Sequence, residues 1–503
     1  MTVLAAFVIL SGAVGEYQIP LEDPLVGWLL YLEPAGVLSQ GGVLPDGFLK
    51  DQPDDNRHHD RYWWSGMDRA VDICLSSGAL SGSRWNRGWS PVLSRLSQAV
   101  APATRTLCRY GSRGFICIGG RALIEGAAGD PGEEFRAGTS LDIQGEVANI
   151  SFVERLSVWA GSDEAPPDGF APWHQGEEEG RHLYVDRGYA TAGLVQGPFW
   201  LTMDFGRIPQ RWGPGRFTSL LISDNSPALD MLRVKLDFGS VDFIGFTSVV
   251  ESDSSTWLTA HRLDMRPWNW LRLGLSEAVL FQSDGPDFAY MNPIIPWYPV
   301  QWNEREDDNA MLAFDATVIP ATGFCGWAEL LVDDFQYQSE YGRPNKTGYT
   351  LGVSAAFPDH PAGFTLEYTR IDRYVYSQKL ERNYYLHDGR IIGSELGPDA
   401  DRLRLEIAAS PGWNLLARLG AEHERQGEGT VEEGWPDTFP EETSFPSGTV
   451  EHITRARAGL SARVLPWLDL GGAGVMVWTR NRGHLAGDSD ESLEGTLSLT
   501  ARW

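Results

Sequence analysis

Basic residues are scarce in this 503-residue chain, because 41 Lys and Arg stand against 68 Asp and Glu and give a formal net charge of −27 at pH 7. A polyanion gains nothing from contact with a phosphate backbone, so this charge disfavours nucleic-acid binding. It favours solubility and the exclusion of other anions. Abundant Gly (56) and Trp (20) are typical of β-rich chains with aromatic belts, but also of sandwiches and carbohydrate-binding proteins, so composition leaves the fold open.

Cysteine is also rare. The four residues, Cys74, Cys108, Cys117 and Cys325, lack the C-x-x-C spacing of a metal site. In an exported chain Cys108 and Cys117 could form a disulfide across a short turn. Four independent thiols are the alternative. The chain also lacks the G-K-[ST], G-x-S-x-G and H-E-x-x-H patterns of phosphate-binding loops, serine hydrolases and zinc proteases, so we expect no metal and no cofactor.

Long apolar runs are missing beyond residues 1–15, MTVLAAFVILSGAVG. This run is too short to cross a bilayer as a helix, and it ends in small residues. It predicts a signal-peptide core with cleavage near Ala13 or Gly15. No Lys or Arg precedes Lys50, so the usual basic segment is missing and a start upstream of Met1 is compatible with the pattern. A buried N-terminal strand or helix is the alternative.

From about residue 114 the side chains alternate between apolar and polar with a period of two. Leu403, Leu405 and Ile407, for example, oppose Arg402 and Arg404. We expect about 18 strands. The predicted segments are 114–125, 139–149, 152–160, 181–194, 198–206, 220–223, 231–238, 241–250, 256–265, 270–278, 310–318, 324–332, 348–357, 363–373, 402–409, 414–422, 453–464, 468–479 and 492–503.

The polar faces carry full charges of both signs, strand after strand. A soluble sandwich also alternates, but an open sheet of this many strands must curl, split or close, and closure removes every edge. Long intervals at 161–180, 282–309, 377–401 and 426–450 are typical of extracellular loops. The sequence therefore predicts an all-β transmembrane barrel of about 18 antiparallel strands, with lipid outside and water inside.

The segment 16–110 differs from the rest, because its apolar residues recur at helical spacing, as in PVLSRLSQAVA (91–101). We expect a small, periplasm-facing α-helical bundle over 16–110 and the barrel over 111–503. Between two predicted strands lies GRIPQRWGPG (206–215), with three glycines and two prolines. This composition predicts a fixed, non-repetitive turn. We expect it to direct Arg207, Arg211 and Arg216 toward carboxylates of the lumen.

Four blocks, in order, resemble one family. GRIPQRWGPGRFTSLLISDNSPALDMLRV (206–234) resembles the R-W-G-P-G…S-L-x-x-S-x-N-x-P signature of Wzi-type capsule assembly proteins, and FAYMNPIIPWYPVQWNEREDDNAMLAFD (288–315), LLVDDFQ (330–336) and LGPDADRLRLE (396–406) are similar to further family segments. The chain departs from the family in its N-terminal segment and in its acidic loop at 426–450. The family-motif positions are Gly206, Arg207, Arg211, Trp212, Gly213, Pro214, Gly215, Ser219, Asn225, Asp333 and Asp334.

The resemblance implies an integral outer-membrane, lectin-like protein that attaches or assembles capsular or exopolysaccharide without catalysis. The expected partners are that polysaccharide, outer-membrane lipid or lipopolysaccharide, and the barrel-insertion machinery, which would read the terminal Trp503. Aromatic faces stack on sugar rings, while amides and carboxylates bind hydroxyls. The polysaccharide-binding candidates are Asn292, Trp297, Gln301, Trp302, Asp308 and Asn309.

Each candidate has a structural alternative, since Trp and Tyr near strand ends commonly form the aromatic girdle of a barrel. Asp333 and Asp334 are interpreted as a solvated turn, with ion binding as the alternative. At the level of the whole protein, a porin or passive channel is the alternative function. A barrel hydrolase is a further one, because Ser219, Ser223 and His261 lie in or near strands and carboxylates are plentiful.

Overall fold

The computed structural model describes residues 107–502 except for 112–113, 130–132, 148–149, 161–180, 197–198, 252–254, 269, 286, 293–294, 305–307, 322, 336–343, 358–361, 413–414, 437–443 and 466. The predicted signal peptide and almost all of the predicted helical bundle lie outside these residues. Residues 107–110 of that predicted bundle belong instead to strand β1 (Leu107–Gly111), which pairs with β2. Strand pairing therefore begins earlier than the predicted domain boundary at 111.

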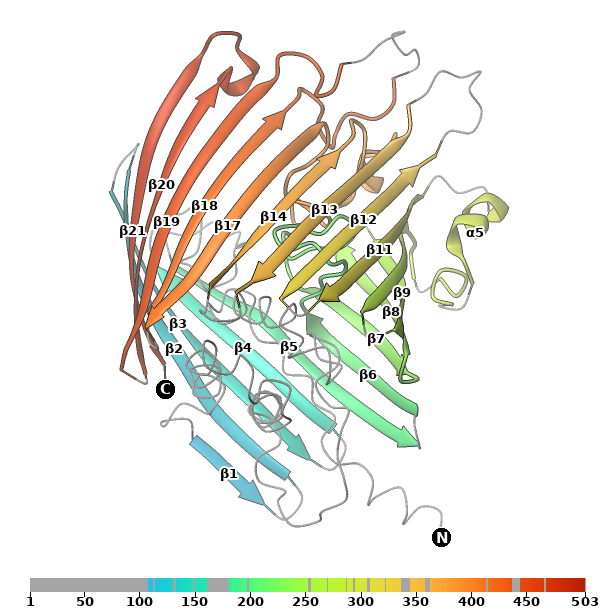
Figure 1. The fold of residues 1–503 in the computed structure, drawn as a ribbon. Coiled ribbons are helices and arrows are strands. Elements are labelled where there is room, and N and C mark those ends of the chain that lie inside the picture. Colours follow the sequence, from blue (N-terminus) through green and yellow to red (C-terminus); the bar gives the residue numbers. More distant parts are fainter. Residues whose placement is uncertain are drawn as a thin grey trace.

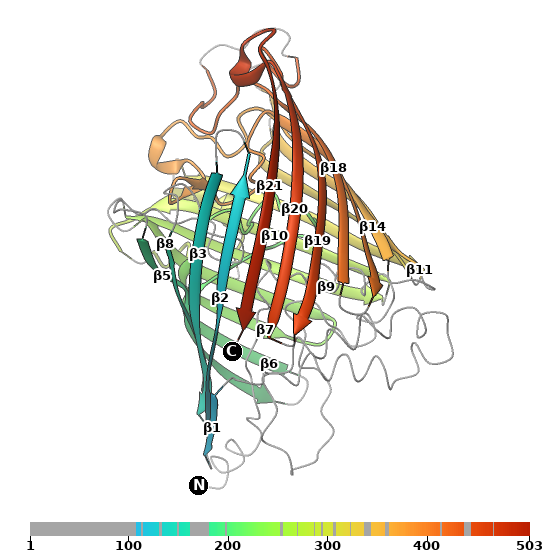
Figure 2. The same ribbon diagram turned by 90° about the vertical axis from the view of Figure 1, so that its left-hand side faces the viewer.

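Eighteen antiparallel strands close into a barrel (Figures 1 and 2). Each strand pairs with its neighbour in the sequence, and the last, β21, pairs with β2. The barrel strands are β2 (Gly114–Ala128), β3 (Glu133–Val147), β4 (Ile150–Ala160), β5 (Arg181–Gln196), β6 (Phe199–Ile208), β7 (Leu229–Asp237), β8 (Val241–Glu251), β9 (Thr256–Trp268), β10 (Leu271–Gln282), β11 (Asn309–Ala321), β12 (Phe324–Asp334), β13 (Lys346–Ala356), β14 (Ala362–Ile371), β17 (Ala400–Gly412), β18 (Leu415–Gln426), β19 (Glu451–Leu465), β20 (Leu468–Arg480) and β21 (Ser489–Arg502).

The closing seam is short. Strands β2 and β21 share eight opposed pairs, from Arg121↔Arg502 to Ala128↔Gly495. On its other side β2 pairs with β3 over fifteen residues. Strand β1 occupies the part of the β2 edge from Gly114 to Ile118 that β21 does not reach. The seam is therefore completed by strands from both ends of the barrel sequence.

Every connection of more than five residues lies at the same end of the barrel. One end, which we call the short-turn end, has connections at 148–149, 197–198, 238–240, 269–270, 322–323, 357–361, 413–414 and 466–467. The opposite, long-loop end includes 161–180, 209–228, 283–308, 372–399 and 427–450. All four predicted long loops fall at this end. In outer-membrane barrels short turns face the periplasm and long loops face the outside.

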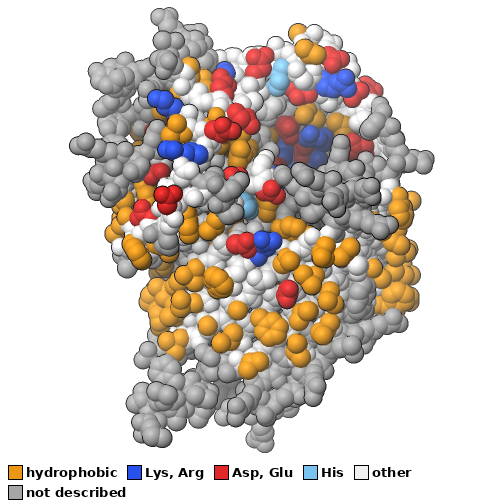
Figure 3. All heavy atoms as spheres, turned by 180° about the vertical axis from the view of Figure 1, so that it is seen from behind, with side chains coloured by type: hydrophobic (Ala, Val, Ile, Leu, Met, Phe, Trp, Pro, Cys, Tyr) orange, Lys and Arg blue, Asp and Glu red, His pale blue; other side chains and the backbone are white. Residues whose placement is uncertain are grey.

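The two faces of the wall meet different surroundings. Leu403 and Leu419 are 47% and 58% exposed and point outward, whereas Arg402 and Glu422 point inward and are buried. Figure 3 shows the result on one side of the molecule, where hydrophobic side chains form a broad band below a zone rich in charged side chains. This alternation confirms the predicted barrel strands, which need an apolar medium outside and a polar one inside.

Helical elements are few among the described residues: α5 (Trp297–Glu304), and the short 3-10 helices η2 (Glu381–Asn383) and η3 (Arg482–His484). A two-stranded hairpin, β15 (Leu386–His387) and β16 (Arg390–Ile391), lies between β14 and β17. In the described part of the chain no helix has the length and hydropathy to cross a membrane. The predicted strand at 220–223 is wrong, because Ile222 makes only an isolated bridge with Trp212.

Candidate functional site: the lumenal plug and the long-loop end

Two long connections fold into the barrel instead of away from it. We call residues 209–228, between β6 and β7, the first plug segment, and residues 372–399, between β14 and β17, the second plug segment. Trp212, Leu220 and Ile222 of the first segment are at most 5% exposed, and Tyr376 and Tyr385 of the second are fully buried. The predicted fixed turn at 206–215 therefore opens a 20-residue segment that fills part of the lumen.

Two carboxylates of the inner wall hold the first plug segment by its backbone. Glu367 in β14 accepts hydrogen bonds from the amides of Arg216 (2.6 Å) and Phe217 (3.0 Å) and from the Trp327 indole (2.9 Å). Glu329 in β12 accepts one from the Leu220 amide at 3.1 Å. Successive amides thus surround a carboxyl group, as they surround the ligand of a phosphate-binding loop, but here the group is a side chain of the protein itself.

The first segment also stabilises its own shape. The Trp212 amide donates to the Ile222 carbonyl at 2.9 Å, and the Ser219 hydroxyl donates to the Trp212 carbonyl. Gly213 has φ +105°, and a Cβ there would lie 2.6 Å from the Glu329 carboxylate. The family-motif glycine at this position is therefore required both by backbone geometry and by the close approach of the wall.

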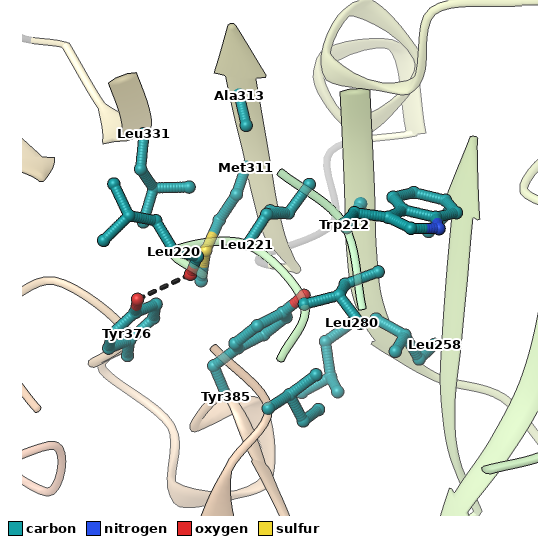
Figure 4. Close-up of a cluster of buried hydrophobic side chains, with 14 of the residues drawn as sticks. Trp212, Leu220, Leu221, Leu258, Leu280, Met311, Ala313, Leu331, Tyr376 and Tyr385 are labelled. Carbon is teal, nitrogen blue, oxygen red and sulfur yellow. Dashed lines mark hydrogen bonds between the residues drawn. The ribbon is translucent and has the colours of Figure 1, made fainter. Parts of the chain in front are cut away.

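Polar contacts join the two plug segments to each other. The Tyr376 hydroxyl donates to the Leu220 carbonyl at 2.6 Å, as the dashed line in Figure 4 shows. Thr218 donates from its hydroxyl to the Glu395 carboxylate at 2.8 Å, and the Asn225 side-chain amide donates to the Ile391 carbonyl at 2.9 Å. Family-motif residue Asn225 therefore links segments that are more than 160 residues apart in the sequence.

Asp333 anchors the second plug segment. It is 3% exposed, accepts a hydrogen bond from the Tyr376 amide at 2.7 Å and lies 3.9 Å from the Lys346 ammonium. Lys346 in turn donates to the Ser377 carbonyl at 2.6 Å. The interpretation of Asp333 as part of a solvated turn is wrong, because its carboxylate points into the barrel. Neighbouring Asp334 is only partly buried at the end of β12.

An apolar core lies between the plug and the wall from β5 to β14, plus Ala400 at the start of β17. Side chains from both plug segments pack there against Leu258, Leu280, Met311 and Leu331 (Figure 4). Trp212 packs edge-on against Phe246 of β8, with ring centroids 5.4 Å apart. A water-filled pore is lined by polar side chains, whereas this sector of the lumen is packed like the interior of a soluble domain.

Charge within the plug is balanced by specific pairs. Burial alone would raise the pKa of Glu395, but the nearby Arg402 guanidinium and the Thr218 hydroxyl lower it below the usual 4.5. Arg402 donates to Glu395 directly. By contrast, burial lowers the pKa of His387, at the tip of the small hairpin, and favours its neutral form.

The arginines of the first block have partners other than those expected from the inner wall. Arg207 pairs with Asp230 at 2.7 Å, and Arg211 lies 3.3 Å from Asp224 and donates to the Gly215 carbonyl. The Arg216 guanidinium lies over the Trp327 ring at 5.1 Å. The expectation of lumenal wall carboxylates is therefore wrong for Arg207 and Arg211, because Asp230 faces outward in β7 and Asp224 belongs to the first plug segment itself. Gly206 lies in β6 and Pro214 in the first plug segment.

A second sector of the inner wall keeps its charged side chains partly exposed. Arg404, Arg455 and Arg457, from β17 and β19, surround Glu422 of β18 and are 27%, 23% and 33% exposed. In the plugged sector, Arg233 and Asp204 form a similar pair but are only 4% and 2% exposed. We call the first group the charged sector. The described lumen is therefore packed on one side and solvated on the other.

The predicted polysaccharide-binding residues do not form one site. Trp297 is fully buried against the outer wall, where it stacks on His261 with ring centroids 4.0 Å apart. The Glu277 carboxylate accepts hydrogen bonds from the amides of Trp297 (2.9 Å) and Tyr298 (2.6 Å), so it caps the start of α5. Figure 1 shows α5 beside β11, outside the barrel.

The remaining candidates lie on both sides of the wall. Asp308 accepts a hydrogen bond from the Tyr290 hydroxyl at 2.6 Å, and both belong to the loop that carries α5. Asn309 points inward and donates to the Asn383 carbonyl in η2. Asn292 is exposed. Gln301 and Trp302 lie in α5, and their side chains lie outside the described part of the structure. Contact of these residues with polysaccharide stays a prediction.

Sequence reasoning missed the wall residues Glu329 and Glu367. Their only signal is an acid at an inward position: Glu367 is alone on the inner face of β14, and Glu329 shares the inner face of β12 with Asp333. In the described ranges no three His, Cys, Asp or Glu side chains are grouped to hold an ion. The site is therefore built from hydrogen-bonded loops and a solvated charged wall.

A closed antiparallel barrel with an apolar outer band, short turns at one end and long loops at the other is an integral outer-membrane barrel. The family model described as "Capsule assembly protein Wzi" matches residues 132–465, which is more than half of the chain. The chain belongs to this family. Its short-turn end accordingly faces the periplasm, and its long-loop end faces the outside of the cell.

One solved structure supports the fold. The chain is similar to the Escherichia coli outer membrane protein Wzi, described as a carbohydrate-binding β-barrel involved in group 1 capsule assembly, at 13% identity and a TM-score of 0.59, covering 95% of this chain and 97% of that chain. Pseudomonas aeruginosa OpdK with vanillate (12% identity, TM-score 0.47) and OccD3 (9%, 0.46) each cover 77% of this chain and 98% and 91% of their own. No curated protein sequence matches.

Proposed function

We propose that this protein binds capsular or exopolysaccharide at the cell surface and helps to attach or assemble it, as a lectin-like barrel without a catalytic step. Membership of the capsule assembly family supports this proposal, as does the similarity over nearly the full length to a barrel described as carbohydrate-binding. The observation that carries it is the plug. A barrel that fills part of its lumen with an apolar core serves better as a rigid platform for its extracellular loops than as a wide pore.

The loop at 283–308 is the extracellular surface we assign to the glycan. Its Phe288 is 84% exposed and its Asn292 is exposed, which gives an aromatic face and an amide on one loop. The buried Trp297 fixes the loop on the barrel wall, so that these groups are held on a rigid support. Aromatic stacking and amide hydrogen bonds are the contacts that proteins commonly make with sugars.

The test is binding of purified protein to the host's own surface polysaccharide, with dextran as the negative control. We expect saturable binding that falls about tenfold in a Phe288→Ala/Asn292→Ala variant, because stacking and one polar contact are lost together. Phe335→Ala, which removes an exposed phenyl ring from another extracellular loop, is the matched control. In cells, deletion of the gene should reduce cell-bound but not secreted polysaccharide. Unchanged surface polysaccharide would refute the proposal.

A passive channel is the second candidate, because the charged sector leaves part of the lumen solvated. Recordings from the pure protein in planar bilayers separate the two functions. A platform should give small or no steady currents, whereas a general porin should give large ones.

A further inference from the structure

One row of side chains crosses the outer wall near the extracellular end. Register pairing places six residues directly opposite one another on neighbouring strands, so they share one face. From β13 to β20 this outer-wall row consists of Tyr349, Arg370, Asp401, Arg425, His452 and Arg480. Figure 2 shows β18, β19 and β20 side by side at this part of the barrel.

The row marks where the apolar band ends. The next row on the same face, toward the periplasm, consists of Leu351, Tyr368, Leu403, His423, Thr454 and Trp478. The row after that is wholly apolar: Val353, Leu366, Leu405, Ala421, Ala456 and Met476. Leu351 and Leu403 are 51% and 47% exposed, so this face looks away from the lumen. The change from apolar through aromatic to charged is the profile of a membrane interface.

The height of the row agrees with that profile. Arg425 lies ten residues after Leu415, which begins β18 at the periplasmic end. Ten residues rise by ~33 Å along a strand, and a tilt of ~40° leaves ~25 Å along the barrel axis. The apolar band of an outer-membrane barrel is about 25 Å tall, so Arg425 lies at the level of the lipid headgroups.

Positive charge collects at this level. Three arginines and one histidine share the row with a single carboxylate, in a chain whose net charge is −27. Asp401 is neutralised already, because Arg425 donates to both of its oxygens, at 2.8 and 2.5 Å, and the Tyr368 hydroxyl donates to it at 2.9 Å. Arg480 is exposed. The Arg–Asp pair orients Arg425, and the exposed Arg480 guanidinium and the His452 ring beside it can donate to another anion.

Aromatic, histidine and acidic side chains lie beside the outer-wall row. The rings of His423 and His452 are 5.7 Å apart, and His423 exchanges a hydrogen bond with the Thr454 hydroxyl. At the β14 end, Arg370 lies 3.5 Å from the Phe445 ring centroid and pairs with Asp372 at 2.9 Å. Glu491 of β21, next to Trp478, is the carboxylate that bounds the surface on the other side. The most accessible positive charge therefore lies over β18–β20.

We propose that the outer-wall row binds the phosphate groups of lipopolysaccharide in the outer leaflet, with Arg480, Arg425 and His452 as donors. Arginine binds phosphate oxygens through paired N–H groups, and basic clusters at headgroup level are the usual device for holding anionic lipid. The apolar rows below would contact the acyl chains, with the Trp478 and Tyr368 rings at the boundary. This assignment rests on the outer-membrane location and not on the proposed polysaccharide binding.

The test uses the full-length protein in phosphatidylethanolamine nanodiscs that contain either bisphosphorylated lipid A or the same lipid A after phosphatase treatment. Native mass spectrometry measures the lipid A that stays bound to the released protein. We expect retention of the phosphorylated form alone, and an affinity about tenfold lower in Arg480→Gln/His452→Gln. A second variant, Arg425→Gln/Asp401→Asn, removes both charges of the Arg425–Asp401 pair together and should also weaken retention.

Arg482→Gln is the matched control, since Arg482 lies two residues from Arg480 but pairs with Asp488 and Asp490 in the next turn. It should retain lipid A like the wild type. Heat-modifiable gel migration confirms that each variant is folded. Equal retention of phosphorylated and dephosphorylated lipid A, or wild-type retention by Arg480→Gln/His452→Gln, would overturn the proposal. So would complete displacement by inorganic pyrophosphate, which would indicate a site for free phosphate. Polysaccharide binding, measured on the same variants, should be unchanged.

Discussion

At the scale of single residues, the plug depends on carboxylates that are satisfied by backbone amides. Glu367 receives three N–H donors and is 2% exposed. Such a group stabilises the loop only while every donor has a partner, because an unsatisfied buried N–H costs about 1–3 kcal/mol. Its contribution is therefore much larger than that of an exposed ion pair, which is worth about 0–1 kcal/mol.

Glu367→Gln tests this dependence. Glutamine keeps one acceptor but replaces the other with an NH2 group that faces the loop amides. We expect a loss of about 2–3 kcal/mol in the free energy of unfolding, read from urea midpoints by heat-modifiable migration. Glu491→Gln, at an exposed position of β21, should change it by less than about 0.5 kcal/mol. Equal midpoints for the two variants would contradict the assigned role.

Gly213→Ala separates backbone strain from lack of space. Gly213 and Gly239 both have positive φ, +105° and +92°, but a Cβ at Gly239 has no atom within 4 Å. Gly239→Ala should therefore cost about 1–2 kcal/mol of strain alone. Gly213→Ala should cost clearly more, since the new methyl group displaces Glu329. Differential scanning calorimetry in detergent measures both, and a smaller loss at Gly213 would count against the close approach.

At the scale of elements, strands were predictable and the plug was not. Alternation along a strand is a local pattern that one face in lipid and one in the lumen impose on each segment, so even β17 could be read from Leu403, Leu405 and Ile407. The plug segments have no period. Their position depends on contacts such as Thr218 with Ser394, across 176 residues, and on acids of the inner wall such as Glu367. Asn309 and Trp297 were predicted to share one site, but they lie on opposite sides of the wall. Their separation could not be predicted either, because it depends on tertiary contacts and not on a local pattern.

Acidification should loosen the two plug segments. The folded-state pKa of Glu395 is lowered from 4.5, so its stabilising contribution is present above about pH 4.5 and is lost as the pH falls through the folded pKa. We expect faster hydrogen exchange of the Thr218 and Ser394 amides below about pH 4. Glu395→Gln should remove this acid-induced step. A step of equal size in wild type and variant would assign it to other groups.

At the scale of the whole molecule, a packed sector and a solvated sector share one barrel. Replacing residues 213–222 by a Gly-Ser linker of equal length removes the amides that Glu367 and Glu329 bind, together with Leu220 and Ile222 of the core. Single-channel conductance should then rise several-fold over the wild type, because the packed sector becomes water-filled. The same replacement in the turn at 481–488 should leave conductance unchanged. An unaltered conductance in the plug variant would show that the constriction lies elsewhere.

The seam between β2 and β21 bears on the order in which the chain assembles. Until the last strand arrives, the edge of β2 offers unpaired backbone groups to any other chain, and such edges promote aggregation. Strand β1 can pair with Gly114 to Ile118 as soon as the first hairpin forms. Only the segment from Arg121 to Ala128 then stays unpaired until β21 is added. Pairing of β1 with β2 thus shortens the unpaired edge that the barrel exposes before it closes. The finished barrel keeps eight opposed pairs where its first and last strands meet, and β1 pairs with the remaining part of the β2 edge.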